Sequence, residues 1–351
     1  MKILFTADWH LGLPQISWTD GNWERILEQQ ASVEEMILQA VKNNCEYFII
    51  GGDIFHTSKP SSKIIEIFAE LIEKIINAGL KIFIIHGNHD ISMHENILKA
   101  IAKFNKDNVL ILSQPASWAF AKINLIFIPF ELGTDYTIEV KRHLVKQKLN
   151  ILVMHDTFSG GMTGSEDFVL KGKTNLIKKV PQVDLVLCGH LHKQQVLSGK
   201  TEVIYPGSIT TIDFGEENDK KGFATIDITS KGITYQMHNL AVKKWKTITV
   251  DLRMKAQKID IPKNTLIKFK FIMTKSQRLG FNLQPFETMI KNSHSKLQKY
   301  TTEVTNKQTT QKKLKQKNPV SQFKEYMKHK KYSVSQIDKC VVQLNNIIKE
   351  I

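Results

Sequence analysis

Short apolar runs that end on polar residues recur along the first two thirds of the chain. Five of them predict β-strands, at residues 2–7, 47–50, 81–85, 151–154 and 184–187. Residues with helical spacing lie between the first three runs. These are Ile26, Gln30, Val33, Ile37 and Val41, and then Ile64, Phe68, Leu71 and Ile75. Strands that alternate with helices indicate βαβ units and a buried, mainly parallel sheet.

The pattern changes beyond residue 195, where strands become short and turns tight. Residues 202–205, 222–228 and 233–238 predict strands, with Ser230–Gly232 as a hairpin turn. We expect these strands to form a second, antiparallel-leaning sheet that packs on the first.

A domain boundary is expected near residues 240–246. Residues 245–252 and 265–273 predict strands, and the second alternates apolar residues with Lys268 and Lys270. Residues 285–300 predict a helix, and the polar segment 301–317 predicts a linker.

Residues 318–351 predict a pair of helices. The second helix carries an apolar stripe of Ile337, Val341, Leu344, Ile348 and Ile351. This stripe can dock on its own domain or in the groove or coiled coil of a partner. The predicted fold class is α/β: a two-sheet sandwich flanked by helices (residues 1–240), a small α+β cap with its linker (241–317), and the helix pair (318–351).

Charge is distributed unevenly between these parts. Residues 1–240 carry 24 Lys and Arg against 27 Asp and Glu, whereas residues 241–351 carry 25 against 7. This asymmetry favours a polyanionic partner such as nucleic acid, although a solvated Lys-rich surface gives the same count. Three widely spaced cysteines argue against a disulfide framework. Without a signal peptide or a membrane-spanning run, the sequence predicts a cytoplasmic protein with no membrane association.

Metal-ligand residue types follow each of the five predicted strands. In open α/β sheets, ligands bind beyond the carboxyl ends of the strands, so these residues should meet on one rim. They are Asp8, His10, Asp53, Asn88, His155, His190 and His192. Oxygen and imidazole donors without thiolate suit Mn²⁺, Fe²⁺ or Zn²⁺.

A pair of such ions indicates phosphoester hydrolysis. Two ions polarise the phosphoryl oxygens and activate water, and they need a bridging group, for which Asp53 is the candidate. His89 is the candidate general acid for the leaving oxygen. Asp90 can orient that imidazole or lie exposed in the turn. Glycines 52, 87 and 189 suit the sharp turns that release each ligand from its strand.

The ordered set Asp-X-His, Gly-Asp, Gly-Asn-His-Asp, a distal His and Gly-His-X-His resembles the calcineurin-like metallophosphoesterase superfamily. The resemblance implies that Asp8, His10, Asp53 and His192 hold the first metal ion. It implies that Asp53, Asn88, His155 and His190 hold the second.

The motifs Asp8–Gly12, Gly52–His56, Tyr205–Ser208 and Asp213–Glu216 give a narrower resemblance, to the SbcD-type nuclease subunit of double-strand-break repair complexes. It implies a homodimeric, Mn²⁺-dependent enzyme that acts on DNA as a 3′–5′ exonuclease on duplex ends and as an endonuclease. It also implies that residues 318–351 dock on an SMC-like coiled-coil ATPase. Residues 63–77 and 93–104 are candidates for the dimer face, although core packing explains both equally well.

By the same resemblance, His56 lies near the DNA end and helps to place the scissile phosphate. A helix-capping or buried imidazole is the alternative for this residue. Two other functions stay open at this stage: a phosphatase or cyclic-nucleotide phosphodiesterase on the same core, and a catalytically silent scaffold that loads an ATPase onto DNA.

Overall fold

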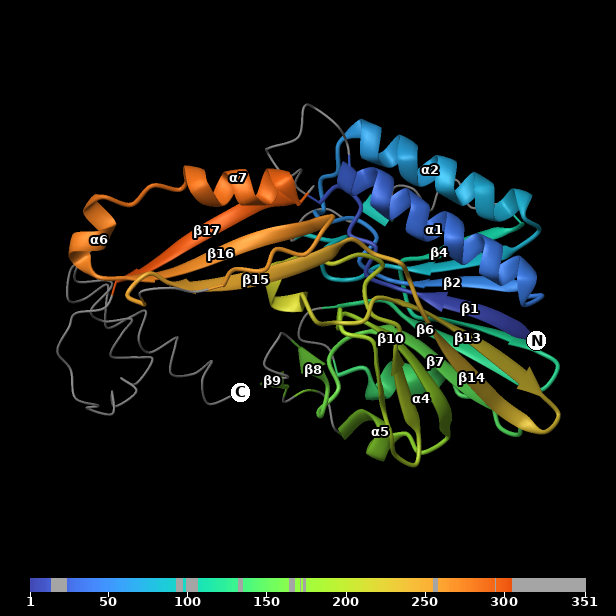
Figure 1. Ribbon diagram of the computed structural model, residues 1–351. Coiled ribbons are helices and arrows are strands. Elements are labelled where there is room, and N and C mark those ends of the chain that lie inside the picture. Colours follow the sequence, from blue (N-terminus) through green and yellow to red (C-terminus); the bar gives the residue numbers. More distant parts are fainter. Residues whose placement is uncertain are drawn as a thin grey trace, which may run out of the picture. The chain divides into compact units, whose positions relative to one another are not determined.

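The fold is described from a computed structural model (Figure 1). The structure describes residues 1–13, 24–92, 97–98, 107–131, 135–163, 168–170, 172, 175–254, 258–293 and 295–304. Most of the candidate dimer segment 93–104 and all of the predicted helix pair 318–351 lie outside these residues. Among the described residues, no helix combines the length and the apolar character needed to cross a membrane.

Two six-stranded sheets form the body of the fold. In spatial order the first contains β14 (Gly232–Asn239), β13 (Gly222–Thr229), β1 (Lys2–Thr6), β2 (Tyr47–Gly51), β3 (Lys81–Ile85) and β4 (Val109–Leu112). The second contains β11 (Gln195–Leu197), β12 (Glu202–Tyr205), β10 (Val183–Gly189), β7 (Leu149–His155), β6 (Ile123–Ile128) and β5 (Ala116–Phe120). A short hairpin pairs β8 (Met162–Thr163) with β9 (Phe168–Val169).

The strands are divided between the sheets differently from the prediction. Strands β1 to β3 belong to the first sheet, whereas β7 and β10 belong to the second. The predicted hairpin turn is confirmed, but the β13–β14 hairpin pairs antiparallel with β1 in the first sheet, with Leu4 opposite Thr225. Because β2 occupies the other side of β1, the hairpin covers an edge that would otherwise present unpaired backbone groups.

Helices cover the outer faces of both sheets (Figure 1). Helices α1 (Glu24–Lys42) and α2 (Ser62–Asn77) pack on the first sheet. Helices α4 (Thr137–His143) and α5 (Asn175–Lys179) pack on the second. Phe48 and Ile49 are neighbours on β2, yet Phe48 packs under the helices and Ile49 packs between the sheets. Fully burying one such side chain contributes about 1.5–3 kcal/mol. The two sheets with helices on each outer face make four layers, which is an α/β sandwich of the predicted class.

Helix α1 departs from its predicted apolar stripe at one end. Ile26, Val33 and Ile37 are buried as expected, but Val41 is 51% exposed. The inward face instead includes Arg25, Gln29 and Ser32, which are buried polar residues.

A third sheet, called the cap below, has three strands in the order β15 (Lys244–Asp251), β16 (Thr265–Met273) and β17 (Lys296–Val304). Helix α7 (Gln284–Asn292) packs on it through Ile290 and Phe286. In β16, Phe269 and Phe271 are fully buried and Lys270 is exposed, so the predicted alternation is confirmed. The prediction of a helix over 285–300 is wrong beyond Asn292, because residues 296–304 add a strand to the sheet.

By its contacts, the chain divides into two compact units. One contains residues 1–273 and 280–303, and the other contains residues 274–279 and 304–351. Of the second unit, the described part is Thr274, helix α6 (Lys275–Leu279) and Val304. The predicted division at residues 240 and 317 stays a prediction.

Candidate metal centre

The candidate ligands meet where strands of the two sheets end. Backbone hydrogen bonds tie the strand ends together: Asp8 N donates to Gly52 O at 3.0 Å, and His10 N donates to Asp53 O at 3.0 Å. Across the sheets, His190 N donates to the Asp8 carboxylate at 3.0 Å. The structure therefore brings together all of the predicted ligands, and His56 and His89 lie against His10 at their edge.

Several ligand-bearing residues have a left-handed backbone. The φ angles are +55° for Asp8, +46° for His10, +51° for Asp53 and +93° for His190. Side-chain-bearing residues rarely adopt these angles, and such strain persists only where the surrounding structure enforces it, typically at functional sites. Asp8, Asp53 and His190 lie within two residues of the ends of β1, β2 and β10.

The glycines of the site have a different role from the predicted one, except at residue 52. Gly52 has a φ of +96°, as a sharp turn requires. Gly87 and Gly189 are needed for space instead. A Cβ on Gly87 would overlap Asp53 Oδ1, and one on Gly189 would lie 2.6 Å from His155 Nδ1.

The ligand atoms form two groups that adjoin one another. Among the predicted ligands, Asp8, His10 and His192 form one group and Asp53, His155 and His190 form a second, and within each the ligand atoms lie within 4.8 Å of one another. A further group with the same spacing joins His10 to His56 and His89. A carboxylate oxygen of Asp53 lies 3.2 Å from His155 Nε2 and 3.7 Å from His10 Nε2, so it contacts one imidazole of each group.

Asn88 joins the second group. Its Oδ1 lies 2.9 Å from His190 Nδ1 and 3.2 Å from His155 Nε2. Asn88 thus adds an amide oxygen to the carboxylate oxygens and imidazole nitrogens that meet at this point.

Burial dominates the electrostatics of the first group. It raises the pKa of Asp8, and the charge of Asp53 adds to the rise against the lowering influence of His155 and His192. Burial, together with the neighbouring His192, holds the pKa of His10 well below its ordinary value. His10 is thus an uncharged imidazole beside two buried carboxylates, which is the form that binds a metal ion.

The second group contains a strongly attracting pair. Burial alone would lower the pKa of His155, but the charge of Asp53, their hydrogen bond and the charge of Asp8 raise it to about 10. Burial raises the pKa of Asp53, but His155 outweighs it and the net shift is downward. Burial and the charge of His155 lower the pKa of His190 to about 3. A proton on His155 thus offsets the negative charge of Asp53 and Asp8.

The donor set fits a pair of divalent ions. His10 Nε2 and His192 Nε2 face each other at 3.1 Å, and at most one proton can satisfy both lone pairs. Two fully buried carboxylates lie beside them. Buried groups of this kind are unfavourable without a counter-charge, and a cation coordinated by the set would supply it.

His89 and His56 stack at the edge of the ligand set. Their ring centroids are 5.8 Å apart, and His89 lies edge-on to His10 at 4.7 Å. His89 Nδ1 is 2.9 Å from the backbone oxygen of His56, and its backbone N–H donates to Asp53 Oδ1 at 2.8 Å. Burial lowers the pKa of His56.

Asp90 serves neither of the expected purposes. It is fully buried, and its carboxylate accepts backbone hydrogen bonds from Phe55 and Gly87, each at 2.9 Å, and from Ile54 at 3.3 Å. Burial, with the charge of Asp53, raises its pKa to about 7. Asp90 therefore fixes the two loops that carry Asp53 and His89, and does not orient the His89 imidazole.

Polar residues of α1 that belong to none of the sequence motifs hold two loops of the site. Gln29 Nε2 donates to the backbone oxygens of Trp9, at 2.7 Å, and His10, at 2.8 Å. Ser32 Oγ donates to Ile209 O at 3.1 Å, and Arg25 donates to Thr211 O. Arg25, Gln29 and Ser32 follow helical spacing, so the pattern was visible, but it did not indicate which carbonyl groups they meet.

Two further residues contact His192, and their sequence positions did not predict these contacts. Glu216, just after Gly215 in η2 (Phe214–Glu216), lies 2.6 Å from His192 Nδ1 through Oε1. Lys221, which is 1% exposed, donates to Glu216 Oε2 at 2.7 Å. Glu216 belongs to a motif noted in the sequence, whereas nothing in the sequence marked Lys221.

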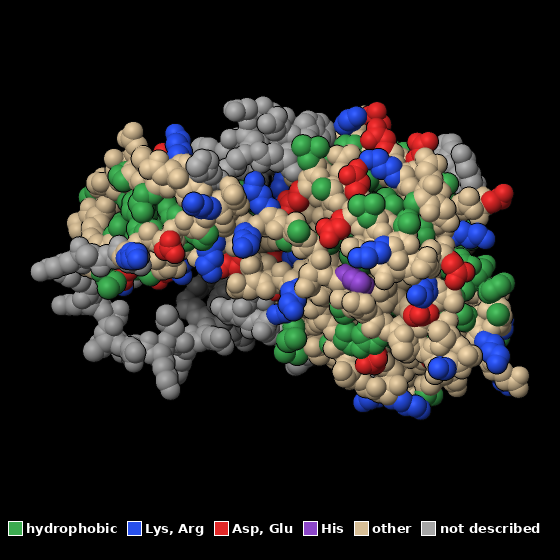
Figure 2. Space-filling view, turned by 45° about the vertical axis from the view of Figure 1, so that its right-hand side comes forward, with side chains coloured by type: hydrophobic (Ala, Val, Ile, Leu, Met, Phe, Trp, Pro, Cys, Tyr) green, Lys and Arg blue, Asp and Glu red, His purple; other side chains and the backbone are tan. Residues whose placement is uncertain are grey.

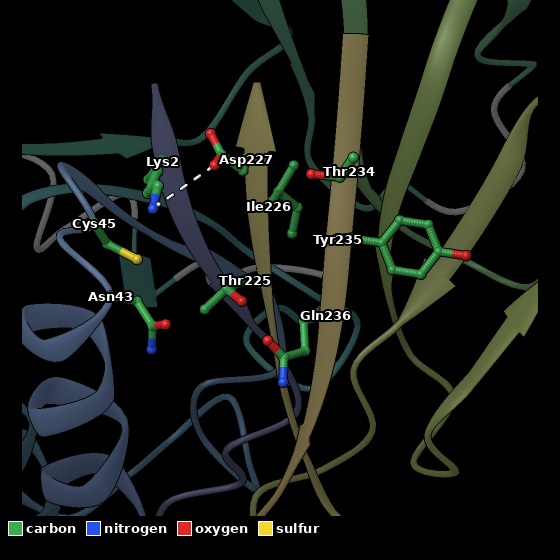
Figure 3. A pocket seen from close by; sticks show the side chains of 9 residues that line it. All are labelled: Lys2, Asn43, Cys45, Thr225, Ile226, Asp227, Thr234, Tyr235 and Gln236. Atoms are coloured by element: carbon green, nitrogen blue, oxygen red, sulfur yellow. Dashed lines mark ion pairs between the residues drawn. The ribbon is translucent and has the colours of Figure 1, made fainter. Parts of the chain in front are cut away.

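A cavity of about 260 Å³ lies away from this site, at the opposite end of β1 from Asp8 (Figure 3). Lys2 and Asp227 pair across it at 3.7 Å, and Asn43 and Cys45 line one side. It shares no residue with the candidate ligands and is not part of the metal centre.

The chain is similar to one family model and to several known proteins. Residues 1–194 match the family model described as calcineurin-like phosphoesterase. The D subunit of the nuclease SbcCD from Staphylococcus saprophyticus is 27% identical over 268 residues, which is 67% of each chain. Exonuclease subunit 1 of Enterobacteria phage T4 is 28% identical over 247 residues, which is 68% of each chain. The alignments thus span about two thirds of each relative. Among solved structures, TT1561 of Thermus thermophilus has a TM-score of 0.43 at 13% identity, over 67% of this chain and 98% of that chain.

Proposed function

Because the chain belongs to the calcineurin-like phosphoesterase family, we propose that it is a Mn²⁺-dependent DNA nuclease. In this proposal it acts on duplex ends as a 3′–5′ exonuclease and also as an endonuclease. The observation that carries the proposal is the convergence of the whole ligand set on one rim, in a chain whose relatives include proteins named as a nuclease and an exonuclease.

The family fold implies a site for two divalent ions, and the residues present fit such a site. We assign Asp8, His10, Asp53 and His192 to the first ion, and Asp53, Asn88, His155 and His190 to the second, with Asp53 as the bridge. The ions would polarise the phosphoryl oxygens and activate the attacking water. His89 donates a proton to the leaving oxygen, and His56, beside it, places the scissile phosphate.

The cap supports DNA as the substrate. Lys268 of β16 lies over the Phe214 ring at 5.7 Å from its centroid, and Lys246 of β15 pairs with Glu217 at 3.6 Å. Phe214 and Glu217 lie in the segment that carries Glu216, and Glu216 contacts His192. Basic strands of the cap therefore lie against the segment that contacts His192. Figure 2 shows Lys and Arg side chains on the cap. Such residues bind phosphates without regard to sequence.

The test compares substrates under one set of conditions. We expect Mn²⁺-loaded protein to degrade linear duplex DNA from its ends and to nick circular single strands. Labels at either end of the duplex report the polarity. Raising the salt from about 50 to 200 mM should sharply reduce DNA binding, since the contacts are with phosphates. Hydrolysis of small phosphate esters or cyclic nucleotides alone would refute the proposal and favour a small-ester enzyme.

The partner proposal concerns residues 318–351, which lie outside the described residues. We assign them to docking on the coiled coil of an SMC-like ATPase, in keeping with a relative named as one subunit of a nuclease complex. Deleting residues 318–351 should abolish co-purification with that ATPase and spare the nuclease activity of the isolated chain. Unchanged co-purification would refute the assignment.

Homodimerisation and a cytoplasmic, DNA-associated location are parts of the same proposal. Sedimentation equilibrium of the isolated chain tests the first, and a monomer across the working concentration range would contradict it. Fractionation of cells that express the chain tests the second, and recovery with membranes would contradict it.

A further inference from the structure

We propose that Glu216 is the positioning residue of His192, and that it fixes the imidazole with Nδ1 as donor and Nε2 as the free ligand nitrogen. The inference rests on the proposed function only in treating His192 as a ligand of the first ion. It gives a role to the motifs Tyr205–Ser208 and Asp213–Glu216, which the proposed chemistry leaves unused.

The geometry of the contact determines which nitrogen of His192 is free. Glu216 Oε1 lies 2.6 Å from His192 Nδ1. A carboxylate can only accept, so Nδ1 carries the proton and donates it. The other nitrogen, Nε2, lies 3.1 Å from His10 Nε2, on the side of the first ion. A carboxylate on the outer nitrogen of a ligating histidine fixes the ring and makes it a better donor to the metal.

Glu216 is itself held in place. Its second oxygen, Oε2, accepts hydrogen bonds from the ammonium of Lys221 at 2.7 Å and from Ile212 N at 2.9 Å. Lys221 also donates to His192 O at 3.1 Å. Glu216 is 8% exposed and Lys221 is 1% exposed, so the pair is shielded from solvent. A buried lysine beside a buried carboxylate favours the ionised form of Glu216, which accepts more strongly than a neutral group.

The loop before η2 holds the backbone of the same histidine. Ser208 N donates to His192 O at 3.1 Å. Gly207 has a φ of +81°, and a Cβ there would lie 3.0 Å from His192 O and 2.9 Å from Gln194 N. His192 is thus fixed at its ring by one motif and at its carbonyl by the other.

The experiment measures metal binding and the tautomer, with no nucleic acid present. Metal-free wild type, Glu216→Gln and Glu216→Ala are titrated with Mn²⁺, and free Mn²⁺ is followed by electron paramagnetic resonance. Removing such an outer partner typically weakens metal binding by about 10- to 100-fold. We expect this loss for one of the two ions in Glu216→Ala. We expect a smaller loss in Glu216→Gln, whose amide oxygen still accepts but carries no charge.

The matched control is Glu217→Gln. Glu217 lies next to Glu216, but it accepts a hydrogen bond from Thr247 N of the cap at 2.6 Å. Its replacement should leave both Mn²⁺ affinities unchanged. An equal loss in Glu217→Gln would assign the effect to displacement of the whole segment and overturn the proposal. Wild-type affinity for both ions in Glu216→Ala would also overturn it.

The second readout is the ¹⁵N spectrum of the His192 ring in metal-free protein, at a pH where the ring is neutral. We expect a single Nδ1-protonated tautomer in wild type and Glu217→Gln, and a mixture in Glu216→Ala. An unchanged tautomer would overturn the proposal.

If Glu216→Ala does not fold because Lys221 is left as an uncompensated buried charge, the pair Glu216→Gln with Lys221→Met removes both charges. The smaller loss of affinity predicted for Glu216→Gln is expected there. Failure of the nuclease proposal would leave all of these results unchanged.

Discussion

His89→Ala is expected to slow phosphodiester hydrolysis by about 10²- to 10⁴-fold, which is the usual contribution of a positioned general acid, and to leave metal binding intact. His89 Nδ1 lies 2.9 Å from the His56 carbonyl oxygen, which can only accept, so Nδ1 holds its proton there. The other nitrogen is then the one that can donate to a leaving oxygen. Because His89 is not one of the assigned ligands, its removal should spare the ions.

Substrates with different leaving groups distinguish a general acid from a residue that only positions the substrate. A p-nitrophenyl phosphodiester releases p-nitrophenolate, a stable anion that needs little protonation, so the variant should lose much less activity on this substrate than on DNA. The matched control is His143→Ala, a distant histidine near Ser117, which should behave as wild type. Equal losses on both substrates would assign His89 to positioning, and full activity on DNA would remove it from the site.

The strand-end ligands were predictable because each follows a continuous apolar run, and a buried strand must end where its polar residue begins. Asp8, Asp53 and His155 needed no knowledge of the sheet order to be expected on one rim. The allocation of the strands to the two sheets could not be predicted in the same way. Nothing local in residues 222–238 indicates that β13 pairs with β1, some 220 residues away in the chain. That pairing depends on an open sheet edge, which is a tertiary property.

Local ambiguity explains the other differences. Leu297 fits the helical spacing of residues 285–300, but in the structure it packs on the core of the cap from β17. The sequence did not indicate the backbone contacts of Asp90 either. The same sequence pattern is compatible with a buried carboxylate that accepts from backbone amides and with an exposed carboxylate in a turn. Glu216 lies 24 residues from His192, and only the folded chain shows that the two side chains meet.

Asp53→Asn should have the second large effect, through loss of the bridging charge. Asp53 contacts one imidazole of each ligand group, at 3.2 and 3.7 Å. Asparagine keeps the shape and one oxygen but not the charge. Metal-ion catalysis supplies several kcal/mol of charge stabilisation, so its impairment corresponds to about 10³-fold in rate. Mn²⁺ titration should show that at least one ion no longer binds. Binding of both ions with wild-type affinity would contradict the assignment of Asp53 as the bridge.

The same variant should change the pH dependence of stability in metal-free protein. The pKa of His155 is about 10 in the folded chain, chiefly because Asp53 outweighs the opposing effect of burial. A raised folded-state pKa stabilises the fold fully below the ordinary value of about 6.5, and the stabilisation is lost as pH rises through about 10. Without the Asp53 charge the pKa of His155 should fall, so this loss should move to lower pH and become smaller.

Urea unfolding of metal-free protein between about pH 6 and 10 measures this difference directly. The control is Asp184→Asn, which replaces a carboxylate that accepts from Asn150 N at 2.7 Å, at the start of β10 and away from the ligands. It should keep the wild-type pH profile and both ions. An unaltered profile in Asp53→Asn would mean that Asp53 does not hold the His155 proton. Because a metal ion stabilises the folded chain only where it binds, Mn²⁺ should raise the melting temperature of wild type and Asp184→Asn much more than that of Asp53→Asn.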